Sequence, residues 1–462
     1  MSRKRTYGTE DIKFVQASAL LPALLAGVLV AIDVAKAKFV VAITNTAGEL
    51  LSLLRFEHPT QTRLFLGLLA QLRSGTPSLQ VLMEPTGTYG DSLREQLKAA
   101  GHPVFMIQPK YTHDLREVID GVPSSHDSKS AITMIHLHLN GFSREWQRLD
   151  SSRRALHALL TRVKMHDDEA RRRYGQLEAT LARHWPEFSA WMDVHKQWSA
   201  LALLREFQGP AGVAAEPQKA EECLRRASRG ALSRELIAGV IECAKTSLGV
   251  PLEPEERALM RELVDEIERH ERTSAAIEEE IDGLSASDPV FQSLKAVVGI
   301  AAAAAIAAML GSPKNYPSAR AYLKAAGLNL RVFESGEKRG TVSITKRGPS
   351  LVRQLLFLAA LRWIQNDPIA RAWYAGRGSY RANEKTAAVV ALMRKLLTGL
   401  WASIRNGQEF DSAKLFDTRR LADQETAQRT GKPITKRTGP RSTIRRRGRK
   451  SPRTAHQGGA HA

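Results

Sequence analysis

Three apolar segments near the start of the chain constrain its fold most. Residues 28–32, 39–43 and 50–54 are almost continuous runs of Val, Ile, Leu, Ala and Phe, and short polar turns separate them. Each run is too short for a typical helix, so the pattern predicts three consecutive β-strands joined by tight turns.

Strand-like and helical stretches then alternate. Apolar runs at 79–83 and 104–107 follow helical stretches at about 60–72 and 89–99. The resulting order, β-β-β-α-β-α-β, is that of an α/β ribonuclease-H-like (RuvC-like) domain, whose mixed sheet carries functional carboxylates at strand ends. We therefore expect such a domain over residues 27–145, preceded by an N-terminal extension over residues 1–26.

The rest of the chain is predicted to be mainly helical. Residues 146–289 contain two long charged runs, 153–181 and 253–281, in which apolar residues recur every three or four positions, as in a coiled-coil hairpin. A Gly/Pro/Ala-rich stretch at 209–217 is expected to mark its tip. Residues 290–410 predict a mainly α-helical domain, and residues 411–462 a disordered basic tail.

An N-terminal export signal is the alternative that residues 19–32 raise, because this apolar stretch follows Arg3, Lys4 and Arg5. Pro22 and Gly27 interrupt it, and no A-x-A cleavage pattern follows. The two cysteines form no CxxC pair. We therefore expect a cytoplasmic, nucleoid-associated protein that does not interact with membranes.

The charge distribution predicts a polyanionic partner. The formal net charge is +20, and residues 429–453 contain eleven Lys or Arg and no acid, including Arg445, Arg446 and Arg447. Such a tail is expected to bind phosphate backbones without reading bases. The alternative is a tail that only improves solubility.

Three acids are candidate metal ligands. Asp33 ends the first predicted strand, Glu84 ends the fourth, and Asp127 starts a predicted helix. If the two strands are neighbours, both carboxylates emerge at one edge of the sheet, where Asp127 would complete a Mg²⁺ site for phosphoryl transfer. Taken singly, they also fit a turn residue, a charge at a helix N-terminus and an N-cap.

A serine loop in the C-terminal region is the second candidate. Ser335-Gly336 is surrounded by basic residues that could neutralise a phosphate. They are Lys338, Arg339, Lys346, Arg347 and, on a following helix, Arg353. The same residues also fit a hairpin turn with a solvated basic rim. Val298-Gly299-Ile300 matches half of a helix-hairpin-helix signature, and equally a plain turn between helices.

Together these motifs resemble the DEDD-type insertion-sequence transposases, relatives of the Piv invertase. The resemblance covers about residues 27–145 and 290–410. It rests on ordered matches that include Ile32-Asp33-Val34, Met83-Glu84-Pro85-Thr86-Gly87, Val298-Gly299-Ile300, Ala325-Ala326-Gly327-Leu328-Asn329, Glu334-Ser335-Gly336-Glu337-Lys338, Ile344-Thr345-Lys346-Arg347-Gly348 and Asn366-Asp367-Pro368.

The resemblance implies a chemistry. Asp33, Glu84 and Asp127 would bind Mg²⁺ (or Mn²⁺), and Ser335 would attack DNA to form a covalent phosphoserine. It also implies DNA partners (element ends and target), a structured guide (bridge) RNA and a homo-oligomer. Because the acids and the serine lie on separate domains, the active site is expected to be composite.

One position departs from the family pattern. Asp-x-x-Asp reads Asp127-Ser128-Lys129-Ser130, so a hydroxyl replaces the fourth carboxylate. Three interpretations follow: Ser130 binds the metal directly or through water, Asp120 reaches in from the loop, or catalysis is weakened. A nucleic-acid-binding relative without recombinase activity is therefore the alternative function. An actin-like ATPase lacks support, since Ala35-Lys36-Ala37-Lys38 provides no Gly-rich phosphate loop.

Overall fold

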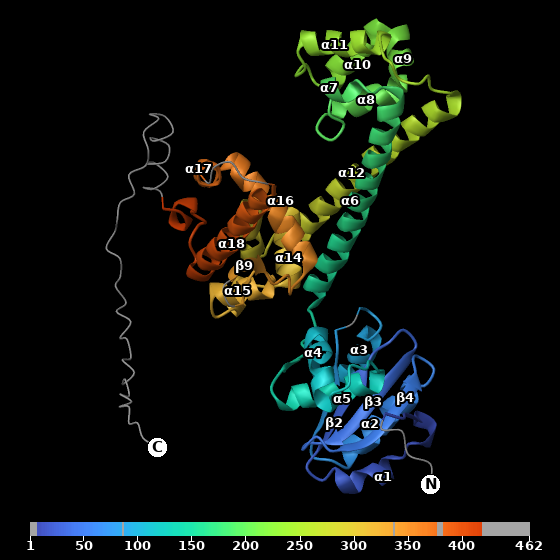
Figure 1. Ribbon diagram of the computed structural model, residues 1–462, viewed down its shortest axis with the longest axis vertical. Coiled ribbons are helices and arrows are strands. Elements are labelled where there is room, and N and C mark those ends of the chain that lie inside the picture. The colour runs from blue at the N-terminus through green and yellow to red at the C-terminus, as the bar shows by residue number, and fades with distance from the viewer. Residues whose placement is uncertain (1–6, 86, 336–337, 377–381, 418–462) are drawn as a thin grey trace, which may run out of the picture. The chain divides into compact units, whose positions relative to one another are not determined.

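The computed structural model describes residues 7–85, 87–335, 338–376 and 382–417 (Figure 1). The chain divides into two compact units, Met1–Leu149 and Asp150–Ala462.

The first unit is built on a mixed seven-stranded sheet. Its strands are β1 (Glu10–Asp11), β2 (Val28–Asp33), β3 (Lys38–Asn45), β4 (Leu50–Glu57), β5 (Leu79–Met83), β6 (Val104–Ile107) and β7 (Ser143–Glu145), in the order β1-β4-β3-β2-β5-β6-β7. Strands β2, β3 and β4 are antiparallel neighbours, whereas β2, β5 and β6 run parallel. The predicted mixed sheet is thus present, and it is consistent with a ribonuclease-H-like domain.

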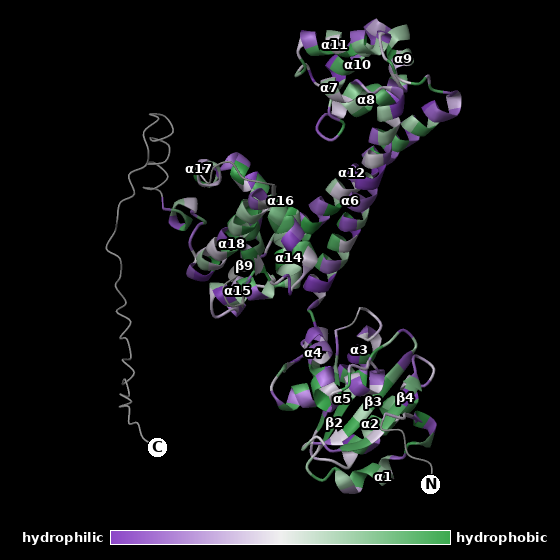
Figure 2. Cartoon of the chain, in the orientation of Figure 1, coloured by the Kyte–Doolittle hydropathy of each residue, from purple (hydrophilic) through white to green (hydrophobic). Residues whose placement is uncertain are grey.

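Helices cover both faces of this sheet. Helices α2 (Thr62–Ser74) and α3 (Asp91–Ala99) pack on one face, where Val30 and Ile32 are buried. Helix α5 (Asp127–Leu139) packs on the other face over Leu29 and Ala31, beside α4 (Pro109–Asp120). Because side chains alternate along a strand, both faces of β2 are apolar, as its unbroken apolar run requires. Figure 2 shows hydrophobic residues concentrated on these strands.

The first 26 residues contribute to this unit. β1 pairs with β4 in parallel, and η1 (Ile12–Phe14), α1 (Ala17–Leu20) and η2 (Leu21–Ala23) follow it. Ile12, Leu20 and Leu24 are buried in the same core as β2. The apolar stretch at residues 19–32, which suggested an export signal, contributes to α1, η2 and β2 in this structure.

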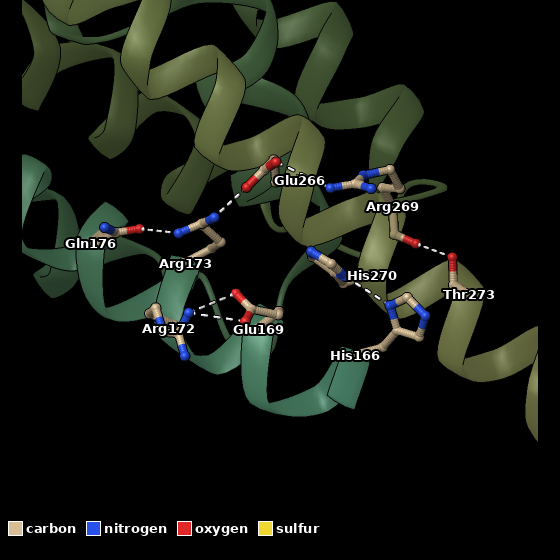
Figure 3. A network of polar contacts seen from close by, with 9 residues as sticks. All are labelled: His166, Glu169, Arg172, Arg173, Gln176, Glu266, Arg269, His270 and Thr273. Carbon is tan, nitrogen blue, oxygen red and sulfur yellow. Dashed lines mark hydrogen bonds and ion pairs between the residues drawn. The ribbon is translucent and has the colours of Figure 1, made fainter. Parts of the chain in front are cut away.

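The second unit begins with two long helices. Helix α6 (Ser151–His184) packs antiparallel against α12 (Pro254–Leu284), as the periodicity predicts. Figure 3 shows polar contacts between them: the Arg173 side chain pairs with Glu266, and His166 Nδ1 lies 2.9 Å from His270 Nδ1.

The far end of this pair differs from the predicted tip. Five short helices lie between α6 and α12 and share one core with the adjoining ends of these two helices. They are α7 (Phe188–Trp191), α8 (Trp198–Phe207), α9 (Pro210–Ala215), α10 (Pro217–Ala227) and α11 (Arg234–Lys245). Residues 209–217 therefore belong to a small helical bundle rather than to a single turn (Figure 1).

The near end of the pair joins the C-terminal helices. Leu156 and Leu160 of α6 and Ile281 of α12 are buried in one core with them. The C-terminal elements are α13 (Pro289–Val298), α14 (Ile300–Met309), η3 (Pro313–Asn315), α15 (Ala319–Ala325), β8 (Leu330–Ser335), β9 (Lys338–Ile344), α16 (Ser350–Asn366), α17 (Pro368–Ala375), α18 (Ala382–Asn406) and η4 (Ser412–Leu415).

Judged by length and composition alone, one helix among the described residues could cross a membrane. It is the Glu384–Asn406 part of α18, and 56% of its apolar segment is buried inside the protein. Leu392, Leu396 and Leu400 are among the residues of the shared core. A core helix of a globular domain has these same properties.

Candidate active site

Asp33 and Glu84 lie at one edge of the sheet in the first unit. β2 and β5 are parallel neighbours in which Ile32 pairs with Met83. Asp33 is the last residue of β2, and Glu84 directly follows β5. By alternation, both follow Ala31 and Leu82 onto the α5 face of the sheet, and Glu84 is buried.

Asp127, the first residue of α5, contributes charge at the same place. Burial raises the pKa of the Asp33 carboxyl to about 7, and the negative charges of Asp127 and Glu84 act in the same direction. Burial also raises the pKa of Glu84. The negative charges of Asp33, Glu84 and Asp127 thus act on one another, and neighbouring cations do not fully neutralise them. We call these three residues the acid edge.

The acid edge has the donor chemistry of a divalent-cation site. Mg²⁺ prefers carboxylate oxygens, keeps several waters and takes substrate phosphate oxygens as further ligands. Within the described residues, no three His, Cys, Asp or Glu side chains stand close enough together to hold a metal ion. Two carboxylates from adjacent strand ends, completed by water and phosphate, are the arrangement that these residues can offer.

Ser130, at the expected fourth acid, faces a cation. Its side chain is buried, and Arg116 Nη1 from α4 lies 3.4 Å from Ser130 Oγ and 2.7 Å from Ser125 Oγ. The positive charge of Arg116 lowers the pKa of both Asp33 and Glu84, against the larger effect of burial. Arg116 therefore offsets part of the negative charge of the acid edge.

Asp120 is held outside the acid edge. Its carboxylate accepts hydrogen bonds from Lys129 Nζ and, at 2.6 Å, from the Tyr7 hydroxyl. These bonds, with one from the Val122 backbone, lower the pKa of Asp120 to about 2. Lys129 is fully buried and also donates to the Val122 carbonyl oxygen at 2.7 Å. In this conformation Asp120 fixes the loop between α4 and α5, rather than supplying the fourth ligand.

Ser335 lies at the end of a hairpin in the second unit. It is the last residue of β8, and its backbone pairs with that of Lys338 in β9. The side chains of Ser335, Lys338 and Arg339 lie outside the described part of the structure, as do Gly336 and Glu337. Arg445, Arg446 and Arg447 of the tail also lie outside the described residues.

Lys346 and Arg347 lie on an exposed loop that two sequence motifs build together. The Lys346 backbone is left-handed (φ 56°), and its N–H donates to the Gly327 carbonyl at 3.0 Å. A Cβ on Gly327 would come within 2.9 Å of the Arg347 backbone, so only glycine allows this approach.

Arg353 supports the same loop from α16. Its Nη1 donates to the carbonyl oxygen of Gly348 at 2.7 Å, and the carbonyls of Ala326 and Pro349 lie at 3.4 and 3.3 Å. The structure therefore gives Arg353 contacts within the protein and leaves Lys346 and Arg347 exposed.

Two family models match this chain. Residues 30–186 match the transposase model of the DEDD type from IS110, and residues 289–375 match the transposase IS116/IS110/IS902 family. The first match spans Asp33, Glu84 and Asp127, and the second spans Ser335. The chain belongs to the IS110 family of transposases.

Curated relatives agree with this assignment. The chain is 29% identical over 174 residues to a probable family 20 transposase of Pseudomonas aeruginosa, which covers 37% of this chain and 51% of that protein. It is 30% identical over 142 residues to the transposase for insertion sequence element IS1328 of Yersinia enterocolitica, which covers 29% and 41%. The matches thus span about half, or less, of these relatives.

Two residues of this IS110-family chain, Arg116 and Lys129, were not predicted from its sequence. Arg116 lies on α4, a helix that was not predicted, so nothing indicated which side chains it would meet. One feature of the sequence could have indicated where the Lys129 side chain points. Lys129 follows Asp127 by two positions in a helix whose neighbouring residues are small or apolar, a spacing that turns its side chain away from that of Asp127.

Proposed function

We propose that this protein is the transposase of an insertion sequence, and that its first unit is a RuvC-like nuclease domain that uses Mg²⁺ or Mn²⁺. The acid edge carries this proposal. It places Asp33 and Glu84 at the ends of adjacent parallel strands, with Asp127 nearby, inside the residues that match the DEDD-type model.

The acids would act by holding the cation and the scissile phosphodiester. A bound divalent cation polarises the phosphoryl oxygens and stabilises the charge that develops in the transition state. Asp33 and Glu84 would hold it from the buried side of the edge, and Asp127, at the exposed start of α5, would reach it through a bound water. Arg116 would orient Ser130 and limit the local excess of negative charge.

Ser335 would be the nucleophile. Its hydroxyl oxygen would form a bond to phosphorus as one of the two ester bonds of the phosphodiester breaks, and the leaving DNA oxygen would take up a proton. Attack of a DNA hydroxyl on the phosphoserine would then rejoin the strand and release Ser335. Exposed Lys346 and Arg347 would bind neighbouring phosphates.

Partners follow from the same proposal. The substrates would be DNA at the element ends and at the target, a structured element-encoded RNA would guide their pairing, and the active form would be a homo-oligomer. Nucleic acid that co-purifies with the protein can be extracted and sequenced. A discrete structured RNA would support guidance, whereas random fragments would count against it.

Strand transfer tests the roles of Ser335 and Asp33. With DNA that carries the element ends, Ser335→Ala should abolish both recombinant product and the covalent protein–DNA adduct seen on denaturing gels. Asp33→Asn should lower the rate by at least about a hundredfold, because it removes a charge that would bind the cation. Ser350→Ala, an exposed serine of the same unit, is the matched control. Full activity of Ser335→Ala would contradict the nucleophile assignment.

A nucleic-acid-binding relative without catalysis is the second candidate. The contact of Arg116 with Ser130 favours it, because a cation lies where the family pattern has a carboxylate. This candidate predicts that the wild-type chain and Asp33→Asn give the same Mn²⁺ titration, because no Mn²⁺ binding depends on Asp33.

A further inference from the structure

A hollow lies next to the start of α5, within the first unit. It has a volume of about 860 Å³ and is lined by residues 7–9, Arg55, Asp120, Val122 and His126. His126 directly precedes Asp127, so the lining is continuous in sequence with the start of α5.

Strand register places Arg55 on the same side of the sheet as Asp33. Asp33 pairs with Val40 of β3, and Val40 pairs with Arg55 of β4. The next row of paired residues on this face of the sheet consists of Ala31, Ala42 and Leu53, which are buried in the core under α5. Because adjacent strands lie about 4.8 Å apart, Arg55 is about 10 Å from Asp33 across the sheet.

The guanidinium of Arg55 is available for a ligand. It is exposed, and none of the described residues forms a hydrogen bond or an ion pair with it. Asp120 is the acid in the lining, and its carboxylate is already paired with the buried Lys129 ammonium group. Asp11 of β1 is paired with Arg55 in the strand register, but no ion pair between the two side chains is formed among the described residues, so the guanidinium remains available to a phosphate.

An aromatic pair forms another wall. The rings of Tyr7 and His126 stack with centroids 5.3 Å apart and planes 28° apart. The Tyr7 hydroxyl is fixed by Asp120, and its backbone carbonyl accepts a hydrogen bond from Ser128 Oγ at 3.2 Å. Tyr7 thus joins the N-terminal segment to the start of α5.

We propose that this hollow binds the single DNA strand that flanks the phosphodiester at the acid edge. Arg55 would contact a backbone phosphate, and the Tyr7–His126 pair would stack with an adjacent base. Guanidinium groups and aromatic rings are the two elements that sequence-tolerant single-strand sites combine. This inference rests on the proposed function, since that function places DNA at Asp33 and Glu84.

Binding can be measured separately from cleavage. The full chain, without divalent metal, is titrated with a short single-stranded DNA that contains 2-aminopurine, whose fluorescence is quenched by stacking. Arg55→Ala should weaken binding roughly tenfold, the effect of a charged contact, and should reduce the slope of log affinity against log salt by about 0.7. Arg63→Ala, which removes the same charge from α2 on the opposite face, should change neither.

Variants of the stacked pair test the other wall. Tyr7→Leu and His126→Ala should remove most of the quenching, and Tyr7→Phe should retain it, because the ring stays while the bond to Asp120 is lost. If Arg55→Ala behaves like Arg63→Ala, or if only RNA of the same sequence is quenched, the inference is wrong. Neither outcome affects the proposed function, which fails instead if Asp33→Asn retains full strand transfer.

Discussion

Two residues set the charge balance at this acid edge: Ser130 is neutral where the resemblance predicts a carboxylate, and Arg116 lies against it. With Asp33, Glu84 and Asp127 charged, Arg116 leaves the cluster two negative charges in excess. One divalent cation would offset that excess. The structure thus contains a positive charge that competes with metal binding.

Arg116→Met should therefore tighten Mn²⁺ binding by about tenfold, because a unit charge within several ångströms contributes more than 1 kcal/mol at an effective dielectric constant of about 20. Isothermal titration calorimetry of the full chain measures this affinity. Arg116→Lys keeps the charge and should bind Mn²⁺ as the wild type does. Weaker binding by both variants would show instead that Arg116 acts by holding Ser125 and Ser130 in place.

At the residue scale, the sequence allowed the strand-end acids to be predicted but not their surroundings. Asp33 and Glu84 each follow an apolar run, and parallel strands bring their carboxyl ends together. Arg116 and Ser130 come from different helices, and their contact depends on how α4 packs against α5. The side chain of Ser335 is not described, so its role rests on the resemblance alone.

At the scale of elements, the long helices followed from periodicity and the bundle beyond them did not. Both α6 and α12 have apolar residues at helical spacing over more than seven turns. Pro210 and Pro217 read as breakers in a Gly/Pro-rich turn, yet each is the first residue of a helix. Proline is tolerated there because the first N–H groups of a helix have no partner within the helix.

The paired histidines make the α6–α12 contact sensitive to pH. Burial lowers the pKa of His270, and the positive charges of Arg269 and His166 act in the same direction, while Glu266 and Glu169 oppose them. Above about pH 6.5, the ordinary value, His270 is neutral in both the folded and the unfolded chain. As the pH falls through that value the unfolded chain takes up the proton first, so stability is lost on acidification.

His270→Gln should reduce this loss. The urea midpoint, followed by helical circular dichroism, is compared at pH 7.5 and pH 5.5 in wild type and variant. The other titrating groups are shared, so the difference between the two shifts belongs to His270. His157→Gln, on the exposed side of α6, should leave the wild-type shift intact. An equal shift in all three proteins would show that the pair does not control the pH response.

At the scale of the whole molecule, the distribution of charge favours a polyanionic partner. The net charge is +20, and eleven basic residues fall within residues 429–453. This segment contains no aromatic residue, so it lacks the means to stack on bases. Neutralising phosphates, with release of their counterions, is the interaction that remains.

Truncation after Asp417 should therefore weaken DNA binding without changing sequence preference. Each phosphate contact adds about −0.9 to the slope of log affinity against log salt on duplex DNA, so losing this segment should flatten the slope by several units. Fluorescence anisotropy at several salt concentrations, on specific and scrambled duplexes, gives both quantities. Truncation after Arg453 is the matched control, since residues 454–462 contain no Lys or Arg. An unchanged slope together with altered choice of sites would mean that the tail reads sequence, because phosphate contacts alone cannot distinguish one duplex from another.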